Sequence, residues 1–395
     1  MNQSFLNRRA FLASACAGGL ATSFAPSISF AQSATDQRFV FVLLRGAMDG
    51  LHAVVPYGDP AYASARGQLA YDRSVLTPLD STFALAPGLS PLAPAFLEGE
   101  LLPVQGLAIP YRTRSHFDAQ SILETGLDKP VGTATGWLNR TLGVIGGASG
   151  AGIAVGGGLP TSLRGEVPVA TWAPKVQRDG DEAFLADLSR LYNQDPQLAD
   201  SFTAALNLQE QAMVMDSGGG KRGLALFDQL FSATGRFLEA DDGPRIAAME
   251  FSGWDTHAGQ GTAGGALDRR LEALANGLLT FKATLSPEVW SKTVVLVSTE
   301  FGRTVATNGT GGTDHGTGGA ALLFGGAVRG GRVIADWPGL ASNQLFEGRD
   351  LRPTLDTRQL LKGVLGAHYD LRNAELNQKI FPDSGAVGAL DGLLI

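Results

Sequence analysis

The stretch TVVLVSTEFGRTVATNGTGGTDHGTGG, residues 293–319, joins an apolar run to a glycine-rich loop that carries polar residues. Residues 294–297 are all valine or leucine, which is typical of a parallel strand covered on both faces. The strand should end near Glu300, and the loop after it contains Asp314 and His315. Because open α/β sheets bind ligands beyond the carboxyl ends of their strands, this stretch predicts a metal site there.

Comparable apolar runs alternate with helical patterns along the rest of the chain. Helices are expected at 115–126 and 266–285, and strands at 39–44, 101–107, 152–155, 167–172, 245–251 and 293–299. This alternation predicts an α/β fold, a doubly wound, mostly parallel sheet with helices on both faces. Residues of about 178–240 are mostly helical and charged in pattern, so we expect a helical insertion there rather than sheet.

The N-terminus predicts export. Residues 1–31 resemble a twin-arginine signal peptide, with Arg8 and Arg9 before Phe11, a weakly apolar stretch and small residues near Ala31. An ordinary secretory signal or a short anchor is the alternative. The prediction is a periplasmic or otherwise exported protein, with the twin-arginine translocase as its partner during export. The α/β domain would span 36–395, with no membrane span in the mature form.

The amino-acid composition limits which reactions and partners we expect. The only cysteine, Cys16, would leave with the signal, which excludes disulfides, thiolate ligands and cysteine nucleophiles from the mature chain. The formal net charge of -7 would become -9 on loss of Arg8 and Arg9, the only charged residues before Asp36. With no basic patch, we expect no nucleic-acid partner.

Six acidic or imidazole residues follow expected strand ends or lie in the loops that leave them. One edge of the sheet could gather them: Asp49, Asp255, His257, Glu300, Asp314 and His315. Carboxylates combined with imidazoles suit divalent ions, here Zn, Mn, Ca or Mg, with one or two ions bound. Structural alternatives stay open, namely a turn at Asp49, a helix cap at Asp255 and an ion pair from Glu300 to Arg303.

Ser115 is the candidate nucleophile. It precedes a helical pattern, so its hydroxyl would lie at a helix N-terminus, where backbone N–H groups favour an anion. His116 would act as a ligand or an acid, and Arg114 would clamp an anionic substrate. In the structural alternative, Ser115 is an ordinary N-cap with Asp118 at the capping-box position.

Several motifs together resemble a known family: Leu44-Arg45-Gly46-x-x-Asp49-Gly50, Arg114-Ser115-His116-Phe117-Asp118, Gly253-Trp254-Asp255-Thr256-His257, Glu300-Phe301-Gly302-Arg303 and Gly312-Thr313-Asp314-His315-Gly316. The chain resembles the exported domain-of-unknown-function family 1501, which looks like a divergent branch of the alkaline phosphatase and sulfatase superfamily. The resemblance implies an alkaline phosphatase-like sheet with two metals and a Ser or Thr nucleophile.

By this resemblance, Asp49 and Glu300 would bind one metal, and Asp255, His257 and His315 the other. Phe301 departs from the superfamily, which tends to have His at that position, so His116 or Asp314 would have to replace the missing ligand.

These observations lead to two hypotheses. The first is an exported metal-dependent hydrolase of phosphate or related esters, acting on a small anionic ester. The alternative is a non-catalytic periplasmic binding or accessory protein that keeps a structural metal site and holds a polyanionic or glycan ligand. Phe301 is the main support for the alternative.

Overall fold

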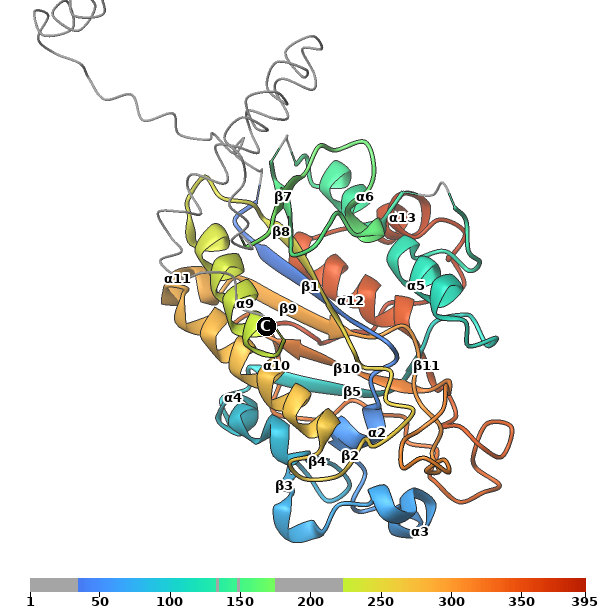
Figure 1. The fold of residues 1–395 in the computed structure, drawn as a ribbon. Coiled ribbons are helices and arrows are strands. Elements are labelled where there is room, and N and C mark those ends of the chain that lie inside the picture. Colours follow the sequence, from blue (N-terminus) through green and yellow to red (C-terminus); the bar gives the residue numbers. More distant parts are fainter. Residues whose placement is uncertain (1–34, 133–134, 148–149, 175–222) are drawn as a thin grey trace, which may run out of the picture.

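The computed structural model describes residues 35–132, 135–147, 150–174 and 223–395. An eight-stranded sheet lies at its centre, in the order β11-β5-β10-β9-β1-β8-β6-β7 (Figure 1). The strands are β1 (Arg38–Arg45), β5 (Leu101–Ala108), β6 (Gly152–Val155), β7 (Ala170–Trp172), β8 (Ile246–Ser252), β9 (Thr293–Ser298), β10 (Gly319–Phe324) and β11 (Leu355–Asp356). Within this sheet β10 alone runs antiparallel to its neighbours. The predicted mostly parallel sheet is confirmed.

Helices cover both faces of the sheet. One layer contains α9 (Ala225–Glu239) and α10 (Ala266–Ala283), and the other contains α5 (His116–Thr125), α6 (Trp137–Val144) and α12 (Thr357–Tyr369). Alternate residues of β1 face the two layers. Val40 and Val42 pack with the first layer, whereas Phe39 and Phe41 pack with the second. Two buried faces explain why the strand sequences are continuously apolar.

A smaller unit follows β1 and lies at the lower end of the view in Figure 1. It holds a three-stranded antiparallel sheet in the order β2-β4-β3. Its elements are α2 (Gly50–Ala53), β2 (Val54–Val55), α3 (Tyr62–Arg66), β3 (Thr77–Pro78), β4 (Ala84–Leu85) and α4 (Ala93–Leu97). Two short helices complete the chain further on, α11 (Pro287–Trp290) and α13 (Asn373–Glu375). Nowhere in the described ranges does a helix have the length and apolarity needed to cross a bilayer.

Two of the sequence expectations fall partly or wholly outside the described residues. The signal peptide at 1–31 is one, and residues 178–222 of the helical insertion are the other. The rest of that insertion contains α9, which packs against α10 over the sheet. In the described part of the insertion, the chain therefore adds a helix to a main layer of the fold.

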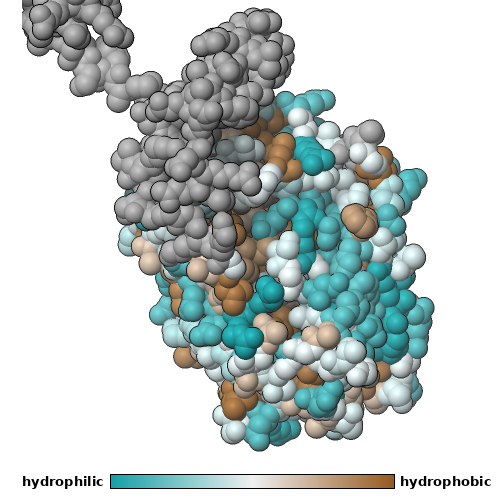
Figure 2. Space-filling view, viewed as in Figure 1, coloured by the Kyte–Doolittle hydropathy of each residue, from teal (hydrophilic) through white to brown (hydrophobic). Residues whose placement is uncertain are grey.

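The carboxyl ends of β1, β5, β8 and β9 meet at one edge of the sheet, and β10 enters the sheet from that edge. The loops at this edge carry the residues that the sequence singled out. In Figure 2 the side of the molecule where Figure 1 draws these strand ends is mostly hydrophilic. The topology therefore gathers polar side chains from distant parts of the chain.

Candidate metal centre

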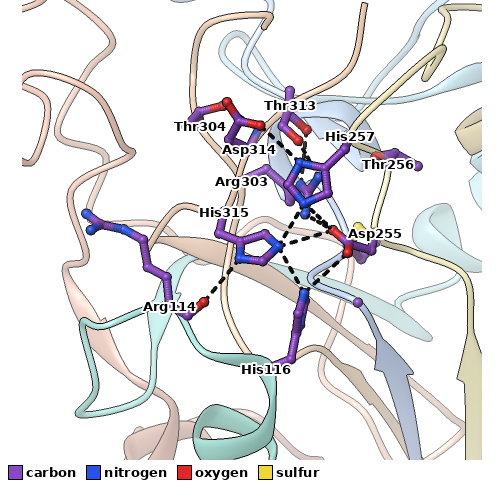
Figure 3. Close-up of polar contacts among 12 residues, drawn as sticks. Arg114, His116, Asp255, Thr256, His257, Arg303, Thr304, Thr313, Asp314 and His315 are labelled. Atoms are coloured by element: carbon purple, nitrogen blue, oxygen red, sulfur yellow. Dashed lines mark hydrogen bonds and ion pairs between the residues drawn. The ribbon is translucent and has the colours of Figure 1, made fainter. Parts of the chain in front are cut away.

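Three imidazoles and one carboxylate point toward one another at this edge (Figure 3). The Nε2 atom of His315 lies 3.0 Å from Nε2 of His116 and 2.9 Å from Nε2 of His257. Asp255 Oδ1 lies 3.0 Å from Nε2 of His257 and 3.3 Å from Nε2 of His315. Its Oδ2 lies 3.5 Å from Nε2 of His116. We call these four residues the open cluster.

The tautomer of His315 follows from its backbone partner. Its Nδ1 lies 3.1 Å from the carbonyl oxygen of Arg114, which can only accept a hydrogen bond. Nδ1 therefore carries the proton, and in the neutral ring Nε2 presents a lone pair. That lone pair faces the other members of the open cluster.

Carboxylates orient the other two imidazoles in the same way. Nδ1 of His116 lies 2.7 Å from Glu300 Oε1, and Nδ1 of His257 lies 3.0 Å from Asp314 Oδ1. Partners of this kind fix the ring and tautomer of histidines that bind metals. Glu300 and Asp314, both expected as ligands, thus contact the far side of a histidine that faces the cluster.

The donor set fits a divalent cation. His116, Asp255 and His315 each offer one ligand atom, and these atoms all lie within 4.8 Å of one another. Ligand atoms around a tetrahedral zinc ion, bonded at 2.0–2.1 Å, are about 3.3 Å apart. Within this group of three, the contacts of 3.0, 3.3 and 3.5 Å bracket that value. His257 lies outside the group but contacts His315 and Asp255. Lone pairs facing one another at such distances repel unless a proton or a metal cation lies between them.

Charge and hydrogen bonding set the protonation of the cluster. Desolvation raises the pKa of Asp255, but the hydrogen bond and charge of Arg303 outweigh it and hold the pKa below its usual value. The hydrogen bond to Glu300 raises the pKa of His116, whereas desolvation lowers the pKa of His315. Asp255 is therefore ionised and His315 neutral near pH 7, the forms that bind a metal.

Close backbone contacts explain the glycines around the site. A Cβ atom on Gly312 would lie 2.3 Å from the backbone of Thr256 and His257, so only glycine lets the loop approach this segment. Gly46 has a φ of +117°, and a Cβ there would lie 2.6 Å from the backbone nitrogen of Asp255. Glycine is thus needed at both positions for packing the segments that carry the open cluster.

Phe301 and Arg303 form the inner wall of the site. The Phe301 ring stacks on His116 with centroids 4.9 Å apart and lies 5.2 Å from the ring of His315. The buried guanidinium of Arg303 donates from Nη1 to Asp255 Oδ1 at 2.5 Å. The ion pair that the sequence left open between Glu300 and Arg303 is replaced by this pair with Asp255.

The structure does not bring Asp49 into the open cluster. Its Oδ2 accepts hydrogen bonds from Arg66 Nη2 at 2.6 Å and from Gln260 Nε2 at 2.9 Å. Its Oδ1 caps the short helix α2 by accepting from the backbone N–H of His52 at 3.2 Å. A buried ion pair occupies the carboxylate that the sequence assigned to a metal.

Arg114 and Ser115 also differ from expectation. The Arg114 side chain points away from the cluster in Figure 3, and its Nη2 pairs with Asp350 at 2.8 Å and Glu347 at 2.6 Å. Its carbonyl, in a residue with φ of 63°, is the part that contacts His315. Ser115 is the N-cap of α5 by backbone position, yet its hydroxyl makes no capping hydrogen bond.

Comparison with known proteins identifies the family. The family described as "Protein of unknown function (DUF1501)" matches residues 101–381. The chain belongs to this family. The matched region includes the whole open cluster, whereas Asp49 and Arg66 precede it. A search of curated proteins finds no match.

Two solved structures show limited similarity. The lipoteichoic acid synthase LtaP from Listeria monocytogenes aligns at 10% identity and a TM-score of 0.36, over 78% of this chain and 68% of that one. The PsFucS1 sulfatase from Pseudoalteromonas sp. aligns at 13% identity and a TM-score of 0.32, over 75% of this chain and 64% of that one. The chain thus spans less than two thirds of the sulfatase. With scores this low, the assignment of the DUF1501 chain to the α/β class depends on its own sheet topology.

Sequence reasoning missed residues that hold the open cluster in place. Gln120 donates from Nε2 to Glu300 Oε1 at 2.9 Å, and its own Oε1 accepts from Arg45. Gln120 lies one helical turn after His116 on α5, so the i to i+4 spacing could have placed both on one face. Asp350, fully buried beneath Arg114, carries no comparable signal because its partner is 236 positions away.

Proposed function

We propose that this DUF1501 protein is an exported metal-dependent hydrolase of phosphate or related esters. The observation that carries the proposal is the convergence of three imidazole Nε2 atoms and the Asp255 carboxylate, each held by a second partner. His116, Asp255, His257 and His315 would bind the ion, with Glu300 and Asp314 orienting two of the histidines. A divalent ion bound there would polarise the anionic group of the ester.

Ser115 is the proposed nucleophile. It starts α5, a helix of 10 residues whose N-terminal backbone N–H groups favour a negatively charged group. Its hydroxyl makes no capping hydrogen bond but shares a side-chain hydrogen bond with Tyr111, which attack on an ester would have to break. In the proposed reaction the Ser115 Oγ forms a bond to phosphorus, the bond to the leaving oxygen breaks, and the hydroxyl proton passes to solvent. Water then forms a bond to phosphorus, the bond from phosphorus to Oγ breaks, and Oγ regains a proton from solvent.

Phe301 favours a second candidate function. Its ring packs against two histidines of the open cluster at a position where the related superfamily tends to have a metal-binding His. A site remodelled in this way suits an exported binding or accessory protein with a structural ion. Its ligand would be a polyanion or a glycan.

Turnover by the metal-loaded protein separates the two functions. We expect elemental analysis to find a divalent ion, and chelation to abolish hydrolysis of a phosphomonoester, phosphodiester or sulfate ester in a panel. Adding back one divalent ion should restore it. His315→Asn should lower metal affinity by at least about 100-fold, since losing even an outer-shell partner costs about 10- to 100-fold.

Ser115→Ala tests the nucleophile, with Ser121→Ala on the same helix as the matched control. Ser115→Ala should keep its metal and lose turnover, whereas Ser121→Ala should keep both. If wild type and Ser115→Ala both bind metal and an anionic ligand but neither hydrolyses any ester, the protein has the second candidate function. A wild-type chain that binds no divalent ion contradicts both functions.

A further inference from the structure

We infer that the chain binds one divalent ion, because the guanidinium of Arg66 supplies the positive charge that a second ion would bring to Asp49. The inference deepens the proposed function and rests on it. Family resemblance implies a second ion held by Asp49 and Glu300. The residues present do not fit that ion.

The first reason is that the Asp49 carboxylate is already fully paired. Its side chain is 1% exposed and the Arg66 side chain 0% exposed, with Arg66 Nη2 at 2.6 Å from Oδ2. Gln260 occupies a second position on Oδ2, and the backbone of His52 occupies Oδ1. Desolvation raises the pKa of Asp49, but the charge of Arg66 and these hydrogen bonds outweigh it and lower the pKa. Asp49 is thus an ionised group whose charge the protein itself compensates.

The second reason is that Glu300 also has Oε1 occupied by the protein's own donors. Its Oε1 accepts hydrogen bonds from the backbone of Gly46 at 2.9 Å, from Gln120 at 2.9 Å and from His116 at 2.7 Å. Its Oε2 lies 2.9 Å from Thr299 Oγ1, whose single proton also faces the carbonyl oxygen of Leu44 at 2.7 Å. Three donors on Oε1 hold the carboxylate where it orients His116 rather than where it would complete a second metal site.

The third reason is that Arg66 is held where it is. Its Nη1 donates to the carbonyl oxygens of Thr304 at 3.3 Å and Val305 at 3.0 Å. Thr307 Oγ1 in turn donates to the carbonyl oxygen of Arg66 at 2.8 Å. Arginine stays charged at every working pH, so no change of protonation frees Asp49 for a metal. A metal at Asp49 would have to displace a buried cation.

The pair also supports the loops that carry the open cluster. The Gln260 side chain, which donates to Asp49, accepts hydrogen bonds on Oε1 from Thr256 at 2.8 Å and from Thr313 at 2.9 Å. Thr256 lies between Asp255 and His257, and Thr313 precedes Asp314. We call Asp49, Arg66 and Gln260 the closed cluster. Its role is to fix these loops with a cation built into the chain.

The test is the number of ions bound by the wild-type chain. Protein would be stripped with a chelator, saturated with Zn²⁺ or Mn²⁺, separated from free ion by gel filtration and measured by elemental mass spectrometry. Titration calorimetry gives the count independently. One ion per chain is expected. Two ions per chain overturn the inference and leave the proposed hydrolase intact, whereas no ion removes the proposed function itself.

A neutral double variant sharpens the result. In Asp49→Asn/Arg66→Met the buried charge pair is gone, and we expect one ion per chain to remain bound, because the side-chain oxygen of the introduced asparagine can still accept from Gln260 Nε2 and so keep the loops in place. His315→Asn is the matched variant that should lose the ion. Loss of the ion from a double variant with a native circular dichroism spectrum overturns the inference. If the double variant does not fold, the number of ions bound by wild type still tests whether the chain holds one ion or two.

Discussion

Two polar clusters lie at the same edge of the sheet, and they differ in what faces the acidic group. In the open cluster, acceptor atoms of three histidines and Asp255 face one another, and the Asp255 and His257 side chains are 39% and 45% exposed. In the closed cluster, donors of Arg66 and Gln260 face the carboxylate of Asp49, which is 1% exposed. Both aspartates pair with a buried arginine, Asp49 with Arg66 and Asp255 with Arg303. The difference is that Asp255 also keeps an exposed side toward the imidazoles, which is the side that we propose binds a metal.

Burial explains why the two clusters cannot exchange roles. A charge moved out of water costs several kcal/mol unless a partner compensates it, so Asp49 could not remain buried and ionised without Arg66. Asp255 and His257 keep contact with solvent, which allows an ion to enter from outside. The open cluster is suited to exchange with the medium, and the closed cluster is suited to stability.

The largest expected effect is the loss of charge from the closed cluster alone. Asp49→Asn leaves the Arg66 guanidinium buried without a counter-charge, and we expect the free energy of unfolding to fall by about 3–5 kcal/mol. Urea denaturation in the presence of a chelator measures this. Asp314→Asn is the control, because its side chain is 54% exposed and its loss should cost less than about 1 kcal/mol. Equal destabilisation by the two variants breaks the distinction between the clusters.

Local sequence predicted most strands of the sheet and the grouping of part of the candidate site. The strands β1, β6, β8 and β9 were expected within one residue or so of their observed bounds, because each is an apolar run bounded by glycine or polar residues. Asp255, His257 and His315 were expected together because they follow or precede strand ends at one edge. Signals of this kind are contained in a few neighbouring residues.

Partners distant in the sequence could not be predicted. Asp49 and Asp255 have the same local signal, and only the fold shows that Arg66 lies against Asp49. The orientation of His116 by Glu300 depends on the order of strands β5, β10 and β9, which periodicity does not reveal. Periodicity also does not reveal the direction of β10, because an apolar run gives no indication that the strand is antiparallel.

A second expected effect concerns buried histidines and pH. Burial lowers the pKa of His52, which contacts Tyr71 beside the closed cluster, to about 3, and that of His368 to about 4. Between pH 6.5 and these values the unfolded chain binds protons that the folded chain does not, so stability falls as the pH falls. From pH 7 to pH 5 each histidine should lower the free energy of unfolding by roughly 2 kcal/mol.

Urea denaturation at both pH values, with chelator present, checks this effect in wild type and in His368→Gln. The glutamine keeps a donor for the carbonyl oxygen of Arg38, which His368 Nε2 contacts at 2.9 Å, but does not titrate. The variant should therefore lose roughly 2 kcal/mol less than wild type on acidification. His116 in the open cluster has a raised pKa and acts in the opposite direction. An unchanged pH dependence in the variant would show that His368 is not buried in its neutral form.

The smallest expected effect is the difference in metal affinity between variants of Glu300 and Asp314, the two carboxylates that orient histidines of the open cluster. The Glu300 side chain is 0% exposed and accepts from three donors on Oε1, whereas that of Asp314 is 54% exposed and screened by water. Glu300→Gln should weaken metal binding by about 10- to 100-fold, and Asp314→Asn by at most about tenfold, with one ion still bound in each. Competition with a chromophoric chelator measures both affinities. A loss beyond about 1,000-fold in Glu300→Gln, or a lost ion, would make Glu300 a direct ligand and bring it back into the metal site that its position after β9 first predicted.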